Sequence, residues 1–387
     1  MKLTARFYIA TLNAPAVAGA LVIFVLGCLL SAADSRAADK AKVSPELAAM
    51  ISSAVDNSIL PALGSFEQAS QATAEKVGAW CASPSAASLE DARKAFGESV
   101  HSWARIEYIR FGPARTNNRW QRIAFLPDPR GVARRQVAKA LADRKPEMLT
   151  ADGIAMQSAA LQGLPALEIL LFSIPESEAA EITNYRCKLS TAIAGYVAAQ
   201  ARDMKSGWMG PDGWRERLIK AGPDDPDYKS PNEAAAELLR ALLTGLQIVR
   251  EEMLLPWQKA AEERKAWAGM PFELSGHARE VTVTSLISLR GLHKALHLDL
   301  VIRSIAAKSR DKKWLARWVP SAYGALEEDV KTAILPSKEG ADAVASEDNL
   351  KELRRARFNI NGLRQIIGRE IAPAAALTIG FNELDGD

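Results

Sequence analysis

A glutamate inside an apolar stretch is the first residue of this sequence that could do chemistry. Glu168 lies in Gly163-Leu-Pro-Ala-Leu-Glu-Ile-Leu-Leu-Phe172. Burying a carboxylate among such neighbours costs free energy unless an arginine pairs with it, a metal ion binds it or water solvates it. Because proline fits the first turn of a helix, Pro165 predicts a helix start that places Glu168 about one turn in. We therefore expect Glu168 to be buried in a paired or functional role.

Residues 113–131 form a predicted loop that is rich in arginine. A long loop in a helical protein is usually functional or disordered, and Trp120 gives this one something to bury. Guanidinium groups can clamp a carboxylate or phosphate with paired hydrogen bonds. The candidates are Arg115, Arg119, Arg122 and Arg130. The alternative is that most of them are solvated, with one or two pairing with Asp128 or Glu168.

Two histidines have a spacing that suits a metal ion. His293 and His297 stand at i and i+4 in a helix predicted over about 277–308, so they would face the same side. The zincin motif needs a glutamate after the first histidine, and that residue is Lys294 here. The metal candidates are Glu168, His293 and His297. The alternative is a pair of surface histidines.

The amino terminus predicts export. Lys2 and Arg6 precede an apolar stretch, and Ser35-Arg-Ala37 offers the small residues that signal peptidase reads. We expect a signal peptide over 1–37 and a periplasmic location. An uncleaved anchor and a lipid attached to Cys28 are the alternatives.

Export changes how the other cysteines are interpreted. An even pair in an oxidising compartment can form a disulfide, so Cys81 and Cys187 are predicted to pair. Two buried free thiols are the alternative.

Helical periodicity extends over nearly all of the remaining chain. Apolar residues recur at steps of three and four, and neither an alternating strand pattern nor a nucleotide-binding glycine motif is found in the sequence. The 387 residues suggest about two domains. We predict an all-α protein of two helical bundles, with a linker over 38–45, bundles over 46–206 and 231–387, and a second linker over 207–230.

Net charge gives no reason to expect nucleic acid as a partner. The formal net charge is +3, and the leader carries three cations and one anion, so the mature chain has 3 − 2 = +1. The expected partners are a small polar ligand or a metal ion, and an envelope or membrane partner is a further candidate.

Four stretches in this order resemble one known family. They are Trp103–Arg110 with Phe111-Gly-Pro113, Arg122–Gly131, Gln162–Phe172 and Gly380–Asp387. From about Pro45 to Asp387 the chain resembles the imelysin family of bacterial periplasmic proteins, which is also classed with the peptidases. The resemblance implies two bundles related by duplication, a site in the cleft between them and an association with iron acquisition.

The chain departs from the hallmark of that family, Gly-x-His-x-x-Glu. Gly163 and Glu168 match, but Pro165 stands where histidine is expected. The chain therefore looks like the branch without that imidazole, unless His293 or His101 replaces it in space.

The chain end carries polar residues that could complete a site. Asn382 and Asp385 could ligate a hard cation or meet the arginine loop. A docked tail without a ligand is the alternative.

These residues favour a periplasmic binding protein over an enzyme. Its interdomain cleft would hold a polar or anionic ligand, or a divalent metal such as iron. The expected lining is Glu168, Arg115, Arg130, Asp128, Asn382 and Asp385. The alternatives are a metal-dependent peptidase that uses Glu168 with a histidine from elsewhere, and a non-catalytic envelope adaptor.

Overall fold

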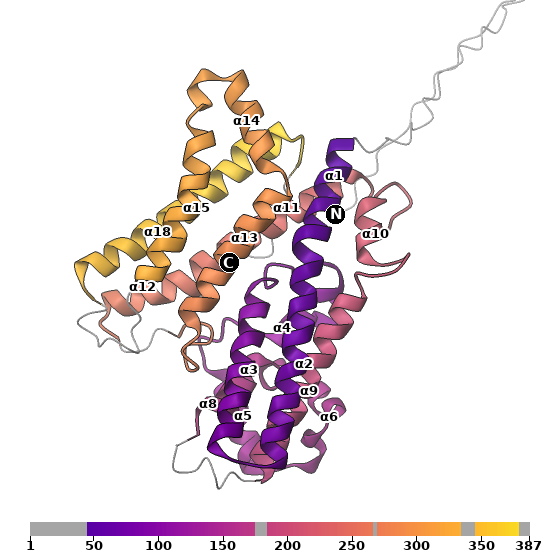
Figure 1. Ribbon diagram of the computed structural model, residues 1–387, viewed down its shortest axis with the longest axis vertical. Helices are drawn as coiled ribbons and strands as arrows, with labels where there is room; N and C mark the ends of the chain where they lie inside the picture. Colours follow the sequence, from indigo (N-terminus) through magenta and orange to yellow (C-terminus); the bar gives the residue numbers. More distant parts are fainter. Residues whose placement is uncertain (1–44, 175–183, 266–268, 334–344, 379–387) are drawn as a thin grey trace, which may run out of the picture. The chain divides into compact units, whose positions relative to one another are not determined.

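Helices make up all the regular structure of the described residues. The computed structural model describes residues 45–174, 184–265, 269–333 and 345–378 (Figure 1). The predicted all-α class is thereby confirmed. The predicted leader, its cleavage site and Cys28 lie outside the described residues.

The first long helices pack side by side along most of their length. α2 (Leu60–Ala82) contacts both α3 (Ala86–Ala104) and α9 (Asn184–Ser206), and α1 (Pro45–Ala54) precedes it. Glu46–Ala82 is the one described stretch long and apolar enough to span a bilayer. Its large apolar side chains, such as Phe66 and Trp80, are fully buried within the protein. That burial is what a core helix requires.

Shorter helices fill the chain between α3 and α9 and position Glu168. α8 (Leu164–Phe172) packs against α3, α9 and α5 (Val132–Asp143). The predicted loop 113–131 is partly helical, since it contains two short 3-10 turns and α4. The remaining short helices are α4 (Arg119–Ile123), α6 (Ala151–Ala155), α7 (Ala159–Gln162) and α10 (Trp214–Ile219).

The later helices continue the same hydrophobic core. They are α11 (Pro231–Ile248), α12 (Leu255–Glu262), α13 (Ala278–Ala295), α14 (Leu298–Lys308), α15 (Leu315–Thr332), α18 (Glu347–Ile366) and the single turn α19 (Ala372–Ala374). α15 packs along α18, while α13 contacts α15, α11 and also α3. Val43–Asp387 forms one compact unit. The division into two bundles stays a prediction.

Three widened helical turns each end two residues before a proline. The π-helical turns Val55–Ile59, Val249–Leu254 and Ile367–Ile371 precede Pro61, Pro256 and Pro373. Proline lacks the N–H that an α-helix uses and its ring crowds the carbonyl four residues back. A π-turn relieves that conflict and lets the helix continue.

The helix predicted over 277–308 is two helices. α13 ends at Ala295, and His297 has a left-handed backbone with φ 51° before α14 begins. His293 and His297 therefore do not share a helix face, and the i, i+4 spacing does not bring them together.

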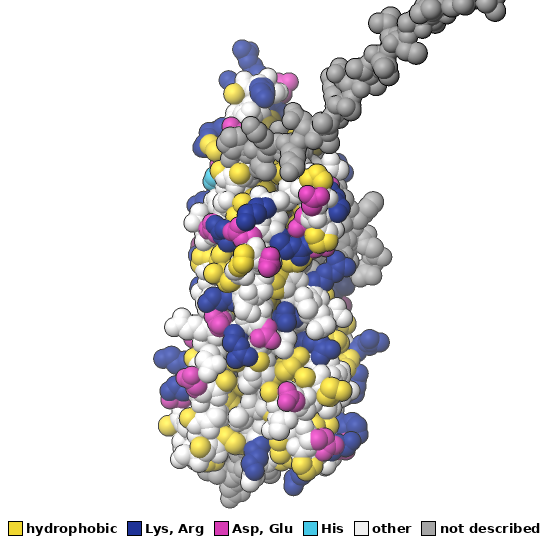
Figure 2. All heavy atoms as spheres, turned by 90° about the vertical axis from the view of Figure 1, so that its right-hand side faces the viewer, with side chains coloured by type: hydrophobic (Ala, Val, Ile, Leu, Met, Phe, Trp, Pro, Cys, Tyr) yellow, Lys and Arg dark blue, Asp and Glu magenta, His cyan; other side chains and the backbone are white. Residues whose placement is uncertain are grey.

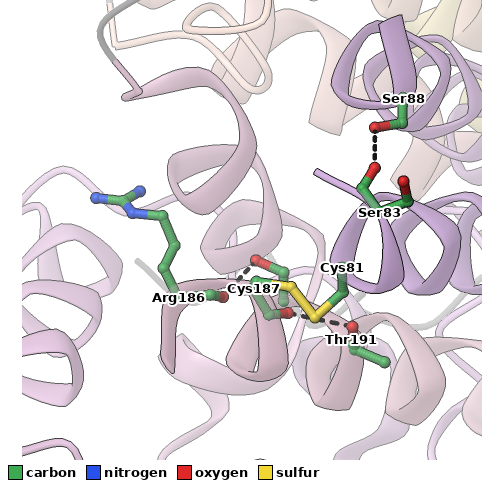
Figure 3. The surroundings of a disulfide bond; sticks show 7 residues. Cys81, Ser83, Ser88, Arg186, Cys187 and Thr191 are labelled. Carbon is green, nitrogen blue, oxygen red and sulfur yellow. Dashed lines mark hydrogen bonds between the residues drawn. A yellow bond between two sulfur atoms is a disulfide. The ribbon is translucent and has the colours of Figure 1, made fainter. Parts of the chain in front are cut away.

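A disulfide joins α2 to α9. Cys81 in the last turn of α2 is bonded to Cys187 in the first turn of α9, with their Cα atoms 5.2 Å apart (Figure 3). Thr191, one turn further along α9, donates a hydrogen bond of 3.1 Å to the Cys187 carbonyl. The predicted pairing is confirmed.

Candidate functional site

Glu168 is positioned by a helix that starts against a neighbouring backbone. Gly163 is the N-cap of α8, and Pro165 lies in its first turn. A Cβ on Gly163 would stand 2.2 Å from the Ile123 carbonyl oxygen, so only glycine permits this approach. The side chain of Glu168 is 7% exposed. The predicted burial of this carboxyl group is found.

Ser275, and not an arginine, is the partner of Glu168. The Ser275 backbone N–H donates to Oε1 of Glu168 at 2.8 Å, and the Ser275 hydroxyl donates to the same oxygen at 2.7 Å. Among the described residues no donor reaches the other oxygen, Oε2. One half of the carboxyl group is thus fixed, and the other half is available.

Burial raises the pKa of Glu168 to about 7. The two hydrogen bonds from Ser275 favour the carboxylate and lower the pKa, while the nearby Glu273 raises it and Arg134 lowers it. The carboxyl group therefore changes its charge near neutral pH. Perturbed groups of this kind cluster at functional sites.

Glu168 lies in the wall of a cavity of about 650 Å³. The cavity also contacts the end of the arginine loop, α12 and the turn before α13. Acidic side chains outnumber basic ones in its lining. The acids are Asp128, Glu168, Glu251, Glu252, Glu263 and Glu273, and the bases are Arg134, Lys259 and Lys265.

A second buried acid reaches this cavity from the π-turn before α12. Glu252 is 9% exposed, and Arg110 lies 3.5 Å from its Oε1. Burial raises the pKa of Glu252, and the charge of Arg110 opposes that rise. The Arg110 guanidinium also lies over the ring of Trp120, 4.3 Å from its centroid. This stacking holds Arg110 in place, and Arg110 is the cation that pairs with Glu252.

Glu107 is a third buried acid, and it interacts electrostatically with Glu252. Glu107 is 8% exposed and accepts a hydrogen bond of 2.6 Å from the Ser285 hydroxyl. Burial raises the pKa of Glu107 to about 8; the bond from Ser285 opposes this, and the charge of Glu252 adds to it. Glu107 therefore holds a proton at neutral pH.

The arginine loop does not clamp Glu168. Arg115 lines a separate cavity with Trp214 and Tyr228, and Arg130 is exposed. Asp128 does line the Glu168 cavity, but its two oxygens cap α5 by accepting the N–H groups of Val132 and Ala133 at 2.8 Å.

The other two arginines of the loop bind its backbone and also tie it to neighbouring segments. Arg122 donates to the carbonyls of Asn117 and Ala155, and Arg119 donates to the Pro113 carbonyl and to Gln200. The loop is an ordered scaffold on these contacts.

The proposed metal set is not assembled. His293 is 2% exposed and lies 3.3 Å from Asp299, against the ring of Tyr323. Within the described ranges, no group of three or more His, Cys, Asp or Glu side chains is placed to hold a metal ion. Glu168, His293 and His297 therefore do not form a metal site by themselves.

Two other histidines pair with each other. His101 and His277 have ring centroids 4.9 Å apart in an edge-to-face arrangement. Burial lowers the pKa of His101, although Glu98 and Glu280 oppose this. His277 follows Ser275, the partner of Glu168, by two residues and precedes the first residue of α13.

The two site candidates at the chain end, Asn382 and Asp385, lie outside the described residues.

Sequence reasoning missed Ser275, Glu252 and Glu107. Ser275 is an unremarkable turn residue, and nothing in the sequence links it to Glu168. Glu252 did carry a signal, since it stands beside Met253-Leu-Leu-Pro256 in an apolar helix. Applied there, the argument that singled out Glu168 would have found it.

Two solved structures share this fold. An imelysin-like protein from Psychrobacter arcticum 273-4 is 17% identical, with a TM-score of 0.64 over 87% of this chain and 97% of that one. A "putative iron-regulated protein A precursor" from Parabacteroides distasonis ATCC 8503 is 12% identical, with a TM-score of 0.65 over 83% of this chain and 94% of that one. At these identities the likeness concerns the fold alone.

The sequence itself matches a family model. No curated protein matches this chain. The model named Peptidase_M75, imelysin, matches residues 59–269, which is more than half of the chain and includes Glu168 and Glu252. The chain belongs to the imelysin family.

Proposed function

We propose that this chain is a binding protein of the cell envelope whose ligand is a small organic cation held in the Glu168 cavity. The observation that carries the proposal is the half-satisfied carboxyl group of Glu168. Ser275 fixes Oε1, and Oε2 accepts no hydrogen bond from the described residues. An ammonium or guanidinium group would supply the missing donor and the compensating charge.

The charges of the cavity favour a cation over the anion that the sequence suggested. The expectation of an anionic ligand depended on arginines beside Glu168, and Arg115 and Arg130 lie elsewhere. Of the ionisable side chains in the lining, six are acidic and three are basic. A low-dielectric cavity with that excess attracts positive charge.

The pKa of Glu168 gives this binding a direction in pH. The side chain carries its full charge only above about 7. Affinity for a cation should therefore rise as the pH rises through 7 and should fall as Glu168 becomes protonated. A cation that stays protonated over this range isolates the effect of the protein.

Iron supply is the setting we propose for this binding. It rests on the name of the Parabacteroides protein, which calls that protein iron-regulated. Direct iron binding is less well supported, since no three described metal-ligating side chains converge. We also propose that the chain is exported to the periplasm and that it consists of two duplicated bundles. We further propose that it belongs to the branch of the family without the motif histidine, and Pro165 at the histidine position supports this assignment.

Thermal shift and calorimetric titration test the proposal with agmatine as the organic cation and citrate as the organic anion. We expect agmatine to raise the Tm at pH 8 more than at pH 6, and citrate to have no effect. Glu168→Gln should abolish the agmatine shift, because the amide carries no charge. Glu90→Gln is the matched control, since Glu90 is exposed on α3. A Tm shift from citrate that survives in Glu168→Gln would overturn the proposal.

The name of the family model keeps one enzymatic alternative to be tested. A metal-dependent peptidase should cleave casein or insulin chains, and chelator or Glu168→Gln should stop the cleavage. Cleavage with these two dependences would replace the binding proposal. We expect no cleavage, because Pro165 occupies the histidine position and Ser275, not a described histidine, is hydrogen-bonded to Glu168.

A further inference from the structure

Two large apolar side chains are exposed on α14 and at the start of α15. Leu300 on α14 is 56% exposed, and Trp314 at the start of α15 is 47% exposed. We call residues 300–318 the α14–α15 corner. A tryptophan that is nearly half exposed is unusual on a protein that faces only water.

Trp314 is held in its exposed position by the packing of Trp318. A Cβ on Gly362 of α18 would lie 2.7 Å from the Trp318 ring, so the ring rests directly on that glycine. Trp314 meets Trp318 edge to face, with centroids 6.1 Å apart. The outer indole therefore has a fixed support, and its exposed face does not need to order on binding.

Positive charge surrounds these apolar side chains. The corner carries six basic residues and one acidic residue, Asp311. Lys312 pairs with Glu370 of the π-turn after α18. The other five are exposed, and none forms an ion pair with another described residue: Arg303, Lys308, Arg310, Lys313 and Arg317.

The α14–α15 corner and the start of α1 lie towards the same end of the folded protein. Figure 1 shows the turn between α14 and α15 at the upper end, and the start of α1 lies towards the same end. Figure 2 shows lysine and arginine side chains at that end, interspersed with hydrophobic and acidic ones. The Glu168 cavity is formed by other elements, namely α8, α12 and the turn before α13.

We infer that the α14–α15 corner docks on an anionic phospholipid surface. Tryptophan prefers the boundary between headgroups and acyl chains, where its ring is apolar and its N–H stays polar. Lysine and arginine are attracted to anionic headgroups, and their long side chains can reach them while the indole enters. The supported tryptophan and the exposed cations of the same corner provide both contributions, and each alone would bind weakly.

Vesicle sedimentation tests the inference with the exported chain, purified without detergent. We expect binding to vesicles of phosphatidylglycerol and phosphatidylethanolamine, little binding to phosphatidylcholine, and loss of binding in high salt. The double variant Lys308→Glu/Lys313→Glu should weaken the affinity at least about tenfold. Lys94→Glu/Lys188→Glu is the control with the same charge change on the exposed surfaces of α3 and α9, and it should bind nearly as well as the unchanged chain.

Quenching by brominated phosphatidylglycerol tests the role of Trp314. The fluorescence of the unchanged chain should be quenched on binding, and Trp314→Phe should lose most of that quenching. If Lys308→Glu/Lys313→Glu misfolds, as shown by a lowered Tm, Arg310→Glu/Arg317→Glu replaces it. Equal vesicle binding by the corner and control variants would overturn the inference, as would quenching that persists in Trp314→Phe. Glu168→Gln should not change vesicle binding, so this test is independent of the ligand proposal.

Discussion

Ser275 donates two hydrogen bonds to one oxygen of Glu168, and 107 residues of chain separate the two side chains. The hydroxyl and the backbone N–H both favour the carboxylate over the neutral acid. Burial in the protein raises the pKa of Glu168, and the turn that precedes α13 opposes this rise.

Ser275→Ala should move the pH dependence of agmatine binding upward. The variant loses the hydroxyl donor but keeps the backbone N–H, so the pKa of Glu168 should rise by about one unit. Titration of agmatine at several pH values measures the midpoint. Ser288→Ala is the control, because Ser288 donates to the Arg105 carbonyl at the exposed surface. An unchanged midpoint in Ser275→Ala would show that Glu168 does not control the binding.

Glu107→Gln should stabilise the protein at alkaline pH. The pKa of Glu107 rises from 4.5 to about 8 on folding, so the folded state binds the proton more tightly. The stability from that proton is fully present below pH 4.5 and is lost as the pH rises towards 8 and above. The amide removes this dependence, and the gain above pH 8 should be on the order of 4 kcal/mol.

Urea unfolding at pH 5 and pH 9 measures this effect. The unchanged protein should lose stability between the two pH values, and Glu107→Gln should lose less. A curve for Glu107→Gln that runs parallel to that of the unchanged protein would mean that Glu107 is ionised in the folded state.

Removal of the disulfide should lower stability without changing the fold. Cys81 and Cys187 are 106 residues apart, and closing a loop of that length restricts the unfolded chain. Cys81→Ser/Cys187→Ser should reduce the free energy of unfolding by about 2–5 kcal/mol. Reductant should lower the Tm of the unchanged protein and leave that of the double variant alone. Equal sensitivity to reductant in both proteins would argue against the bond.

Gly97→Ala should destabilise the contact between α3 and the start of α13. A Cβ there would lie 2.7 Å from the His277 ring, so the ring must move, at about 1–3 kcal/mol. Gly78→Ala is the matched control, because a Cβ at that position of α2 meets nothing within 4 Å. Since alanine favours helix, Gly78→Ala should raise the stability by roughly 0.5–1 kcal/mol. Thermal unfolding compares the two variants, and equal losses would refute the packing argument.

Local signals in the sequence predicted the helices well. Apolar steps of three and four predicted the all-α class correctly, since such periodicity follows directly from the helix repeat. The pairing of Cys81 with Cys187 followed from compartment and number. The break at His297 was missed, because a left-handed histidine carries none of the glycine or proline signals that mark helix ends.

The site could be predicted only in part, because its partners come from distant segments. Apolar neighbours identified Glu168, a property of adjacent residues. Ser275 and Glu252 reach it through tertiary packing, which one sequence does not encode as a local pattern. Arg115 and Arg130 were expected beside Glu168 because their charges are opposite to that of the carboxylate. The short turns of their loop direct these side chains elsewhere.

The three π-turns have a consequence for chain length. Each holds a surplus residue that would otherwise rotate every following side chain by about a hundred degrees around the helix axis. Deletion of one residue within Val249–Leu254 could thus leave α12 with the same orientation. Glu252, the second acid of the cavity, lies in this π-turn. It therefore belongs to the part of its helix where the chain length can change while the following helix keeps its orientation.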